Sequence, residues 1–483
     1  MSSQSTRPID TSRPSPGAPP GTPSTASKSK GLLLLGLSLG YFMVMLDTTV
    51  VTVALPAIGE DLSGSLSGLQ WVSNGYTLTF AALLLTAGAL SDRYGGRKVF
   101  LTGLWLFAIL SGASAAVGSM EALIALRALL GVAGALLLPT SLAIIAHAYT
   151  DPAARARAMG AWAAISGTAL AAGPLVGGVF TDTLGWQAIF LLNVPVALIS
   201  IVLTMKYAPV SVPKASKGID LPGQVSAVLA LAGLTYGLIE SEPEGWGSPQ
   251  VLGGFAVFVV AGALFLLAER RKETETSAPM LPLAMFRNRT LSAGLFAGLL
   301  VNFGLSGVLF VLSLFFQEAH GYSAFTTGLA FLPLTLPTAF NPIFTGRLVG
   351  RIGARKPAIA GFLLMGVGVL IQSASTADST LGLITMCIGL LVLGFGVSFA
   401  IPPLMTAIVG SVAKEQSGIA SGALNSARQT GAVLGVAVLG AVIGGGTSVS
   451  SGTRIALVVA GVVLLAGAGV VAAYIGRPAQ KSA

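Results

Sequence analysis

The stretch LLLLGLSLGYFMVMLDTTVVTVALP, from Leu32 to Pro56, decides the fold. It is about as long as a helix must be to cross the hydrocarbon core of a bilayer, which takes roughly 20 apolar residues. Its one charged residue is Asp47. A carboxylate at that depth costs at least ~2.5 kcal/mol on insertion scales, so an acid inside a span predicts a functional site. The alternative is a structural acid that pairs with a neighbouring helix.

The composition of the whole chain indicates a polytopic membrane protein. Of its 483 residues, 53% are hydrophobic and only 9% are charged, which is more apolar surface than a soluble domain buries. The single cysteine, Cys387, excludes a disulfide framework and a thiolate metal site. The two histidines have no partner at ligand spacing. We therefore expect no catalytic cluster, no metal and no cofactor.

We predict an all-α fold with fourteen membrane-spanning helices, because helices satisfy their own backbone hydrogen bonds in lipid. The expected spans are 32–55, 71–90, 99–117, 121–146, 158–180, 188–205, 221–239, 251–267, 291–316, 326–348, 358–375, 381–409, 418–444 and 455–475. The expected domains are a disordered cytoplasmic tail (1–30), a six-helix bundle (31–206), two inserted helices with flanking loops (207–275), a second six-helix bundle (276–476) and a short tail (477–483).

The basic residues give an independent test of this topology. With the N-terminus in the cytoplasm, all but three of the 27 Lys and Arg residues fall in the loops, tails and span ends on the cytoplasmic side. That distribution follows the positive-inside rule, and it explains the net charge of +9 without nucleic acid. We expect a multi-pass protein of the cell membrane with both termini in the cytoplasm.

An internal repeat joins two of the cytoplasmic loops. Residues 88–98 read GALSDRYGGRK and residues 346–356 read GRLVGRIGARK, with six of eleven positions identical. Both loops follow the second span of a predicted bundle. Repeated halves are typical of transporters that rock one half against the other. Chance similarity between two basic loops is the alternative.

Several stretches resemble motifs of one transporter family. They are the loop 88–98, LDTTVVTVALP (46–56), Arg127 with Gly131, the glycines of 160–178, and the stretches 186–195 and 422–429. In all of them the chain is similar to the fourteen-span drug:proton antiporters of the major facilitator superfamily. It departs from the family pattern at three positions, where Thr52, Leu130 and Ala169 replace Asn, Gln and Gly.

The resemblance implies roles for two groups of residues besides the intramembrane acid. The first group is a conformational latch, whose acid faces the start of the helix expected at 418–444: Gly88, Asp92, Arg93, Gly95 and Arg97. The second is a helix motif that seals antiporters against leak: Gly160, Gly173, Pro174, Gly177 and Gly178. The alternatives are a solvated loop and an ordinary contact between membrane helices.

Asp47 and Arg127 are expected at the same depth. Asp47 lies nine residues before Pro56, and Arg127 lies six after Glu121. At 1.5 Å per residue, both are roughly 10–14 Å below the outer ends of their spans. Equal depth permits an ion pair, and we expect the pair to couple transport to protons. Arg127 as a purely structural counter-ion is the alternative.

The function expected from these features is proton-coupled efflux of drugs by alternating access, which confers antibiotic resistance. Candidate cavity residues are Tyr41, Phe42, Tyr76, Asn302, Asn341, Asn425 and Arg428. The span at 326–348 contains no acid, so we expect neutral or monocationic amphipathic substrates, handled by a monomer. A dedicated exporter of a metabolite made by the host is the alternative. A solute:proton symporter and a membrane-embedded enzyme fit less well.

Overall fold

The computed structural model describes residues 25–210, 220–274, 281–375, 379–446 and 448–476, and all its regular elements are helices. Most of the predicted N-terminal tail and the whole C-terminal tail lie outside the described residues. Residues 25–30 of the predicted tail are the start of the first helix, so the helical part begins earlier than expected.

Seven helices make up the N-terminal half. They are α1 (Thr25–Asp61), α2 (Leu66–Tyr94), α3 (Gly96–Ser114), α4 (Met120–Ala148), α5 (Pro152–Leu184), α6 (Gln187–Leu191) and α7 (Asn193–Tyr207). Side chains of Ser65, Ser119 and Asp151 accept backbone N–H groups at the starts of α2, α4 and α5. Such N-caps satisfy donors that the first turn leaves unpaired. The expected span 188–205 is divided between α6 and α7.

The remaining helices form an inserted pair and the C-terminal half. They are α8 (Leu221–Ile239), α9 (Ser241–Glu244), α10 (Pro249–Thr274), η1 (Leu283–Arg287), α11 (Arg289–Leu314), η2 (Phe315–Ala319), α12 (Ala324–Ala330), α13 (Leu332–Ile352), α14 (Arg355–Ser373), α15 (Thr380–Gly410), η3 (Lys414–Gln416), α16 (Ser417–Gly444) and α17 (Val449–Tyr474). The expected span 326–348 is divided between α12 and α13, where Pro333 lacks a backbone donor.

Eleven helices in the described residues are long and apolar enough to cross a membrane, so the chain is a multi-pass membrane protein. Helices α2, α3 and α13 occupy the other three predicted span positions but are not among the eleven. Their sequences are more polar: α2 contains Gln70 and Asn74, and the first turn of α3 contains Arg97 and Lys98.

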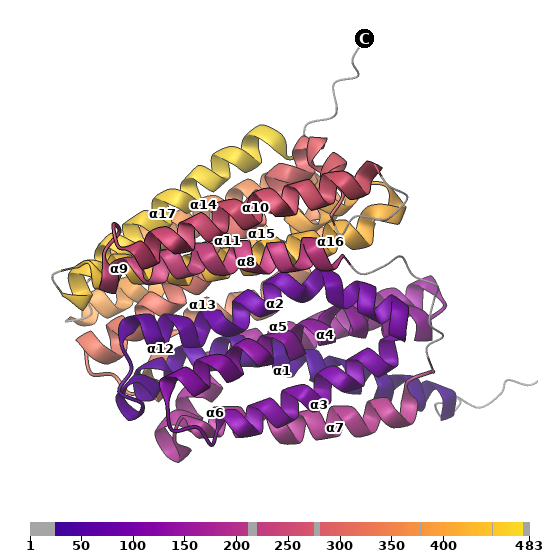
Figure 1. Ribbon diagram of the computed structural model, residues 1–483, viewed down its shortest axis with the longest axis horizontal. Coiled ribbons are helices and arrows are strands. Elements are labelled where there is room, and N and C mark those ends of the chain that lie inside the picture. The colour runs from indigo at the N-terminus through magenta and orange to yellow at the C-terminus, as the bar shows by residue number, and fades with distance from the viewer. Residues whose placement is uncertain (1–24, 211–219, 275–280, 376–378, 447, 477–483) are drawn as a thin grey trace, which may run out of the picture.

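The helices pack as two bundles with the inserted pair over their boundary (Figure 1). Helix α8 contacts both α2 and α16, and α10 packs on the far side of α8. The indole N–H of Trp71 on α2 donates to Glu240 Oε1 at the end of α8 (2.8 Å). Near the other end, Gln224 Nε2 of α8 donates to the Ala82 carbonyl (2.9 Å). The inserted pair is therefore fixed to the N-terminal half at two levels.

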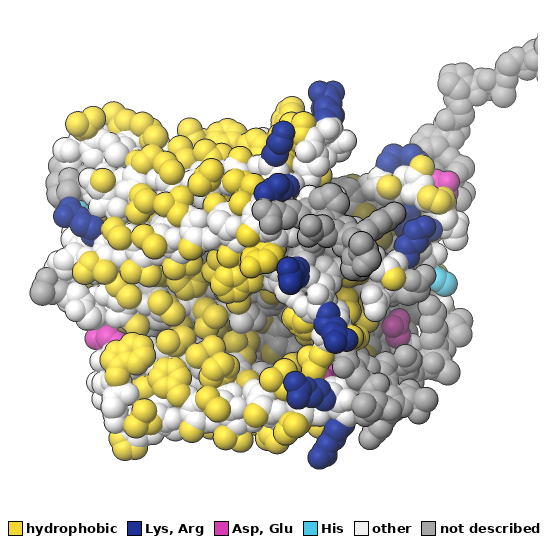
Figure 2. Space-filling model, turned by 90° about the horizontal axis from the view of Figure 1, so that it is seen from above, with side chains coloured by type: hydrophobic (Ala, Val, Ile, Leu, Met, Phe, Trp, Pro, Cys, Tyr) yellow, Lys and Arg dark blue, Asp and Glu magenta, His cyan; other side chains and the backbone are white. Residues whose placement is uncertain are grey.

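Lys and Arg side chains gather toward one end of a largely hydrophobic surface (Figure 2). We call this the basic end; the helix ends there carry Arg93, Arg97, Lys98, Arg155, Arg157, Lys206, Arg287, Arg289, Arg351, Arg355 and Lys356. Helices α1 and α5 begin at the basic end and finish at the opposite end.

The sequence repeat is also a structural repeat. Gly95 (φ 89°) ends α2 and Gly353 (φ 78°) ends α13, each in a conformation that favours glycine. The guanidinium of Arg97 donates to the Met205 carbonyl on α7, and that of Arg355 donates to the Ala472 carbonyl on α17, both at 2.6 Å. In each half the loop arginine thus holds the last helix of its own bundle.

Candidate functional site

The acid of α1 forms a buried ion pair. Asp47 is fully buried, and its Oδ2 pairs with Nη1 of Arg127 on α4, which is only 1% exposed. The other carboxylate oxygen, Oδ1, accepts a hydrogen bond from Asn193 Nδ2 on α7 (3.1 Å). The carboxylate is therefore held by groups from two other helices, which compensates for its removal from water.

Arg127 makes several contacts besides the ion pair. Its Nε donates to the Val72 carbonyl on α2 (3.0 Å). Its guanidinium carbon lies 4.6 Å from the ring centroid of Tyr76 and 5.9 Å from that of Phe190. Cations over aromatic faces are stabilised by the ring quadrupole. Arg127 therefore links α1, α2 and α4 around one charge.

Asn193 is a member of this site that the sequence analysis did not single out. The break between α6 and α7 places it at the start of α7, where its Nδ2 also approaches Ser111 Oγ on α3 (3.1 Å). Ser111 Oγ in turn donates to the Phe190 carbonyl (3.0 Å). The signal was an amide inside the apolar stretch 186–195.

A cavity lies between the two halves. Its lining comes from α1, α2, α4, α5, α11 and α16: Tyr41, Met45, Thr48, Thr49, Thr52, Ser73, Thr77, Phe80, Leu84, Leu138, Leu170, Asn302, Leu305, Ser306, Leu309, Asn425, Arg428, Gln429, Ala432 and Val436. Tyr41 stacks on Trp162 of α5, with ring centroids 4.5 Å apart. The mixture of apolar, hydroxyl and amide groups suits an amphipathic ligand.

The structure brings four of the seven candidate cavity residues to this cavity: Tyr41, Asn302, Asn425 and Arg428. The other three lie elsewhere. Tyr76 is buried beneath Arg127 and donates to the Val44 carbonyl (3.2 Å). Asn341 donates to Thr345 Oγ1 within α13 (3.4 Å). Phe42 is half-buried on α1 and is absent from the cavity lining.

The ion pair lies behind the cavity wall rather than in it. Tyr41, Met45, Thr48 and Thr52 recur every three or four residues and share one face of α1, which lines the cavity. Asp47 points from another face toward α4 and α7. One helix therefore carries the acid on one side and cavity residues on another.

The glycine motif of α5 makes two separate contacts. A Cβ at Gly173 would overlap Thr49 of α1, and one at Gly177 would lie 2.6 Å from the Val50 carbonyl oxygen. Gly178 instead faces the backbone of Ala324, at the start of α12, and the Pro174 carbonyl faces Gly328 of the same helix. Gly160 has open space around it. The motif packs α5 against α1 and against the other half.

The latch residues lie at the basic end. Asp92 is exposed and forms no ion pair with another residue of the described ranges. Arg97 is tied to α7, and Arg93 lies over the Tyr94 ring (5.4 Å to the centroid). Gly88 has no neighbour within 4 Å of where a Cβ would be. Asp92 therefore forms no ion pair with Arg93 or Arg97 in this structure.

Helices α2 and α16 run antiparallel in a constant register. Gln70 Nε2 donates to the Ala437 carbonyl (3.1 Å), Asn74 Nδ2 to the Val433 carbonyl (3.2 Å), and Ser426 Oγ to the Ala81 carbonyl (3.1 Å). Each step along α2 matches an equal step back along α16. Continued to the basic end, this register places Asp92 level with the start of α16.

Hydrogen bonds between the halves are also found near the opposite end. Ser313 Oγ and Gln317 Nε2 of the C-terminal half donate to the Thr52 and Val53 carbonyls of α1 (2.8 and 3.0 Å). The backbone N–H of Phe325 donates to Asp182 Oδ2 on α5 (2.9 Å). These bonds join the two halves at that end.

The family model of the Major Facilitator Superfamily matches residues 37–436, most of the chain. The chain belongs to the Major Facilitator Superfamily. This confirms the family predicted from the motifs, and it identifies a transporter rather than an enzyme. Its fold is similar to that of the nucleoside transporter NupG, with a TM-score of 0.65, 12% identity, and coverage of 92% of this chain and 99% of that one.

Relatives within the superfamily are named for antibiotic resistance and export. The chain is 37% identical over 421 residues to a methylenomycin A resistance protein of Bacillus subtilis, covering 87% of this chain and 89% of the relative. It is also 37% identical over 408 residues to the tetracenomycin C resistance and export protein of Streptomyces glaucescens, covering 84% and 74%. These names agree with the drug-exporting branch predicted from the motifs.

Proposed function

We propose that this protein exports small amphipathic molecules, antibiotics among them, in exchange for protons and thereby confers resistance. The observation that carries the proposal is the placement of the Asp47–Arg127 pair and the cavity on two faces of α1. A protonation change at the acid is thereby transmitted through one helix to the substrate-facing surface. Secondary transporters with repeated halves operate by rocking around such a site.

The proposed topology has fourteen spans, which are the eleven long apolar helices together with α2, α3 and α13. The basic end lies in the cytoplasm, because Lys and Arg are retained on that side of a membrane. Both termini are then cytoplasmic and the protein resides in the cell membrane. It works as a monomer without a cofactor or nucleic acid, and the proton gradient is its source of energy.

With this topology, the bonds near the opposite end close the cavity to the outside, and the described state faces inward. The substrate enters from the cytoplasm or inner leaflet while Asp47 is ionised. After the halves rock outward, protonation of Asp47 removes the charge that holds Arg127 and favours release and return. Each net charge moved contributes ~2.3 kcal/mol per 100 mV of membrane potential.

The latch closes when the halves rock. The register of α2 on α16 carries Asp92 to the start of α16, where the partial positive charge of a helix N-terminus favours a carboxylate by ~0.3–1 kcal/mol. Its exposure in the inward-facing state fits a latch that forms only in the outward-facing one. The second copy of the loop has Gly350 in place of the acid, so the latch is one-sided.

A dedicated exporter of a metabolite made by the host is the second candidate. It is favoured by the relative named as both a resistance and an export protein. Both candidates share the same site and coupling. Genes beside this one distinguish them, because a biosynthetic cluster favours the dedicated exporter.

Transport into inverted membrane vesicles tests the proposal. With a compound panel that includes methylenomycin A and tetracenomycin C, wild-type protein should take up at least one compound only when a pH gradient is imposed, and adding that compound should release protons. Asp47→Asn should insert normally but show neither effect. Glu121→Gln, which removes an exposed acid from the first turn of α4, should behave as wild type. Normal gradient-driven uptake by Asp47→Asn would refute the coupling role.

A further inference from the structure

The cavity between the halves contains a cation and no anion among its lining residues. Arg428 of α16 lines it, and neither Asp nor Glu does. Ion pairs among the described residues join Arg127 to Asp47 and Lys272 to Asp220. Arg428 therefore has no protein counter-ion in the part of the chain that the structure describes.

The guanidinium of Arg428 is positioned with its terminal nitrogens free to meet a ligand. Its Nε donates to Asn302 Oδ1 on α11 (3.2 Å), and Asn302 Nδ2 donates to Gln429 Oε1 (3.3 Å). No acceptor within the described ranges takes a hydrogen bond from Nη1 or Nη2. The side chain is half-buried at the cavity wall, so the amide pair orients it without neutralising it.

A guanidinium stays protonated at every physiological pH, so its charge must be met by solvent or by a ligand. A partly desolvated charge without a partner costs free energy, and an anionic ligand would recover that cost. Two parallel N–H donors of one guanidinium match the two oxygens of a carboxylate. The unpaired Nη groups are the donors that such a ligand needs.

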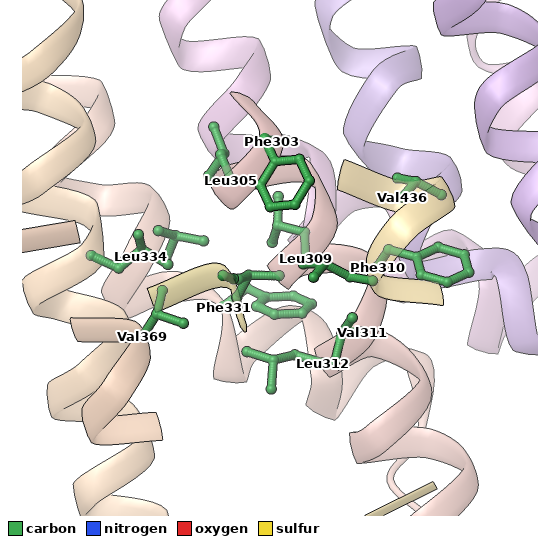
Figure 3. Packing of buried hydrophobic residues seen from close by; sticks show 14 of the residues in the cluster. Phe303, Leu305, Leu309, Phe310, Val311, Leu312, Phe331, Leu334, Val369 and Val436 are labelled. Atoms are coloured by element: carbon green, nitrogen blue, oxygen red, sulfur yellow. The ribbon is translucent and has the colours of Figure 1, made fainter. Parts of the chain in front are cut away.

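We propose that the substrates are amphipathic organic acids whose carboxylate pairs with Nη1 and Nη2 of Arg428. This rests on the proposed export function and names its substrate class. The apolar part of the molecule lies against Leu305 and Leu309 of α11 and Val436 of α16, which are neighbours in the fold (Figure 3). The hydroxyl oxygens of Thr48 and Thr77, which donate to the Met45 and Ser73 carbonyls, accept hydrogen bonds from further polar groups of the ligand.

This substrate class differs from the neutral or monocationic compounds expected from the sequence. That expectation used the absence of an acid from the span at 326–348, whose main helix, α13, contributes no residue to the cavity lining. The charge that a substrate meets is set by α16 instead. A monocation in this cavity would be repelled by Arg428 and would find no carboxylate to compensate.

Export of an acid also changes the electrical balance of the cycle. An anion that leaves the cell and a proton that enters it move charge in the same sense. The membrane potential therefore drives the export of an acid more strongly than that of its neutral ester. This gives a second readout, which a purely structural role for Arg428 would not produce.

Matched probes in proteoliposomes test the proposal. Three sets built on naphthalene, anthracene and pyrene each contain a butyric acid, its methyl ester and the corresponding butylamine. Under an imposed pH gradient we expect wild-type protein to move the acid of at least one set ten-fold faster than its ester or amine. An inside-negative potential, in the sense of the cell, should accelerate export of the acid more than that of the ester.

Variants at and near Arg428 test whether this residue causes the preference for the acid over its ester and amine. Arg428→Gln should abolish the preference for the acid, and Arg428→Lys should retain part of it. Arg289→Gln removes an exposed charge at the basic end and should leave the preference unchanged. If Arg428→Gln fails to fold, Gln429→Glu places a carboxylate beside the same amide, and it too should abolish the preference.

The outcomes separate this inference from the proposed function. If esters or amines move with the pH gradient and acids do not, proton-driven export stands and the substrate class is wrong. If the acid is preferred but Arg428→Gln and Gln429→Glu both keep that preference, the assignment to Arg428 is wrong. If no probe of the nine moves with the gradient, both the export function and the inference are refuted.

Discussion

Thr49 on α1 lies directly against Gly173 on α5, with no room for a Cβ at residue 173. The next turn repeats the contact, with Gly177 against Val50. Small residues allow membrane helices to approach closely and to pack through their backbones. Because Asp47 is two residues before Thr49, this contact also fixes the position of the buried acid.

We predict that Gly173→Ala destabilises the protein by about 1–3 kcal/mol, the usual cost of overpacking a tight contact. The melting temperature in detergent and the initial transport rate should both fall. Thr49→Ala in the same chain should restore part of the loss, because it removes the overlapping hydroxyl. Gly160→Ala is the matched control, since no atom lies within 4 Å of its added Cβ. Unchanged stability of Gly173→Ala would show that the two helices separate easily here.

A double-mutant cycle measures the coupling of the buried ion pair. Arg127→Met leaves Asp47 buried without its counter-charge, and removal of one partner of a buried pair costs about 3–5 kcal/mol. Adding Asp47→Asn removes the orphaned charge, so the double variant should be more stable than Arg127→Met alone. Thermal unfolding of the four proteins provides the comparison. Additive losses would mean that the two side chains do not interact.

The register of α2 on α16 predicts a specific cross-link. A Cβ at Gly422 would lie 2.9 Å from Leu85 Cδ2, so Leu85→Cys with Gly422→Cys should be joined readily by a short thiol-specific reagent. The background carries Cys387→Ser, because that thiol is exposed. Transport should stop after cross-linking, because the halves are then fixed to each other.

The matched control for this cross-link pairs Leu85→Cys with Ser417→Cys. Five residues along a helix correspond to about 7.5 Å, so this pair should react much more slowly. Equal reaction of the two pairs would indicate that α16 slides along α2.

If Asp92 acts as a latch, its neutralisation should lower the transport rate without lowering the amount of folded, inserted protein. Asp92 is exposed, so Asp92→Asn should insert and fold as wild type. Its initial transport rate should fall several-fold, because the outward-facing state loses a stabilising charge, and Asp92→Glu should retain most of the rate. A wild-type rate for Asp92→Asn would mean that the loop is only a solvated connection.

The positions of the helices could be predicted because each span is a long apolar run bounded by polar or basic residues. The ends were less predictable, since caps such as Ser119 extend helices beyond the apolar run. Breaks inside spans were also missed. The break after Ala330 follows from Pro333 and the one at Leu192 from Pro195, because each proline lacks a backbone donor for the preceding turn.

The site was harder to predict because α1 and α4 are apolar on every side. Such helices give no periodic signal for which face meets which neighbour. In the sequence, only their equal predicted depth in the membrane related Asp47 to Arg127. Depth does not show which face of each helix the two side chains occupy. The roles of Asn193 and Ser111, and the position of Tyr76 beneath Arg127 instead of in the cavity, depend on how the helices rotate against each other.

The inserted pair makes the two sides of the molecule unequal toward lipid. On one side, α8 and α10 cover the boundary between α2 and α16, and α10 presents Val259, Val260 and Leu264 outward. On the other side, the boundary between α5 and α13 has no such cover among the described helices, and Phe340, Ile343 and Phe344 of α13 face outward. Lipid therefore contacts the two bundles directly on the α13 side, whereas on the α8 side it contacts the inserted pair.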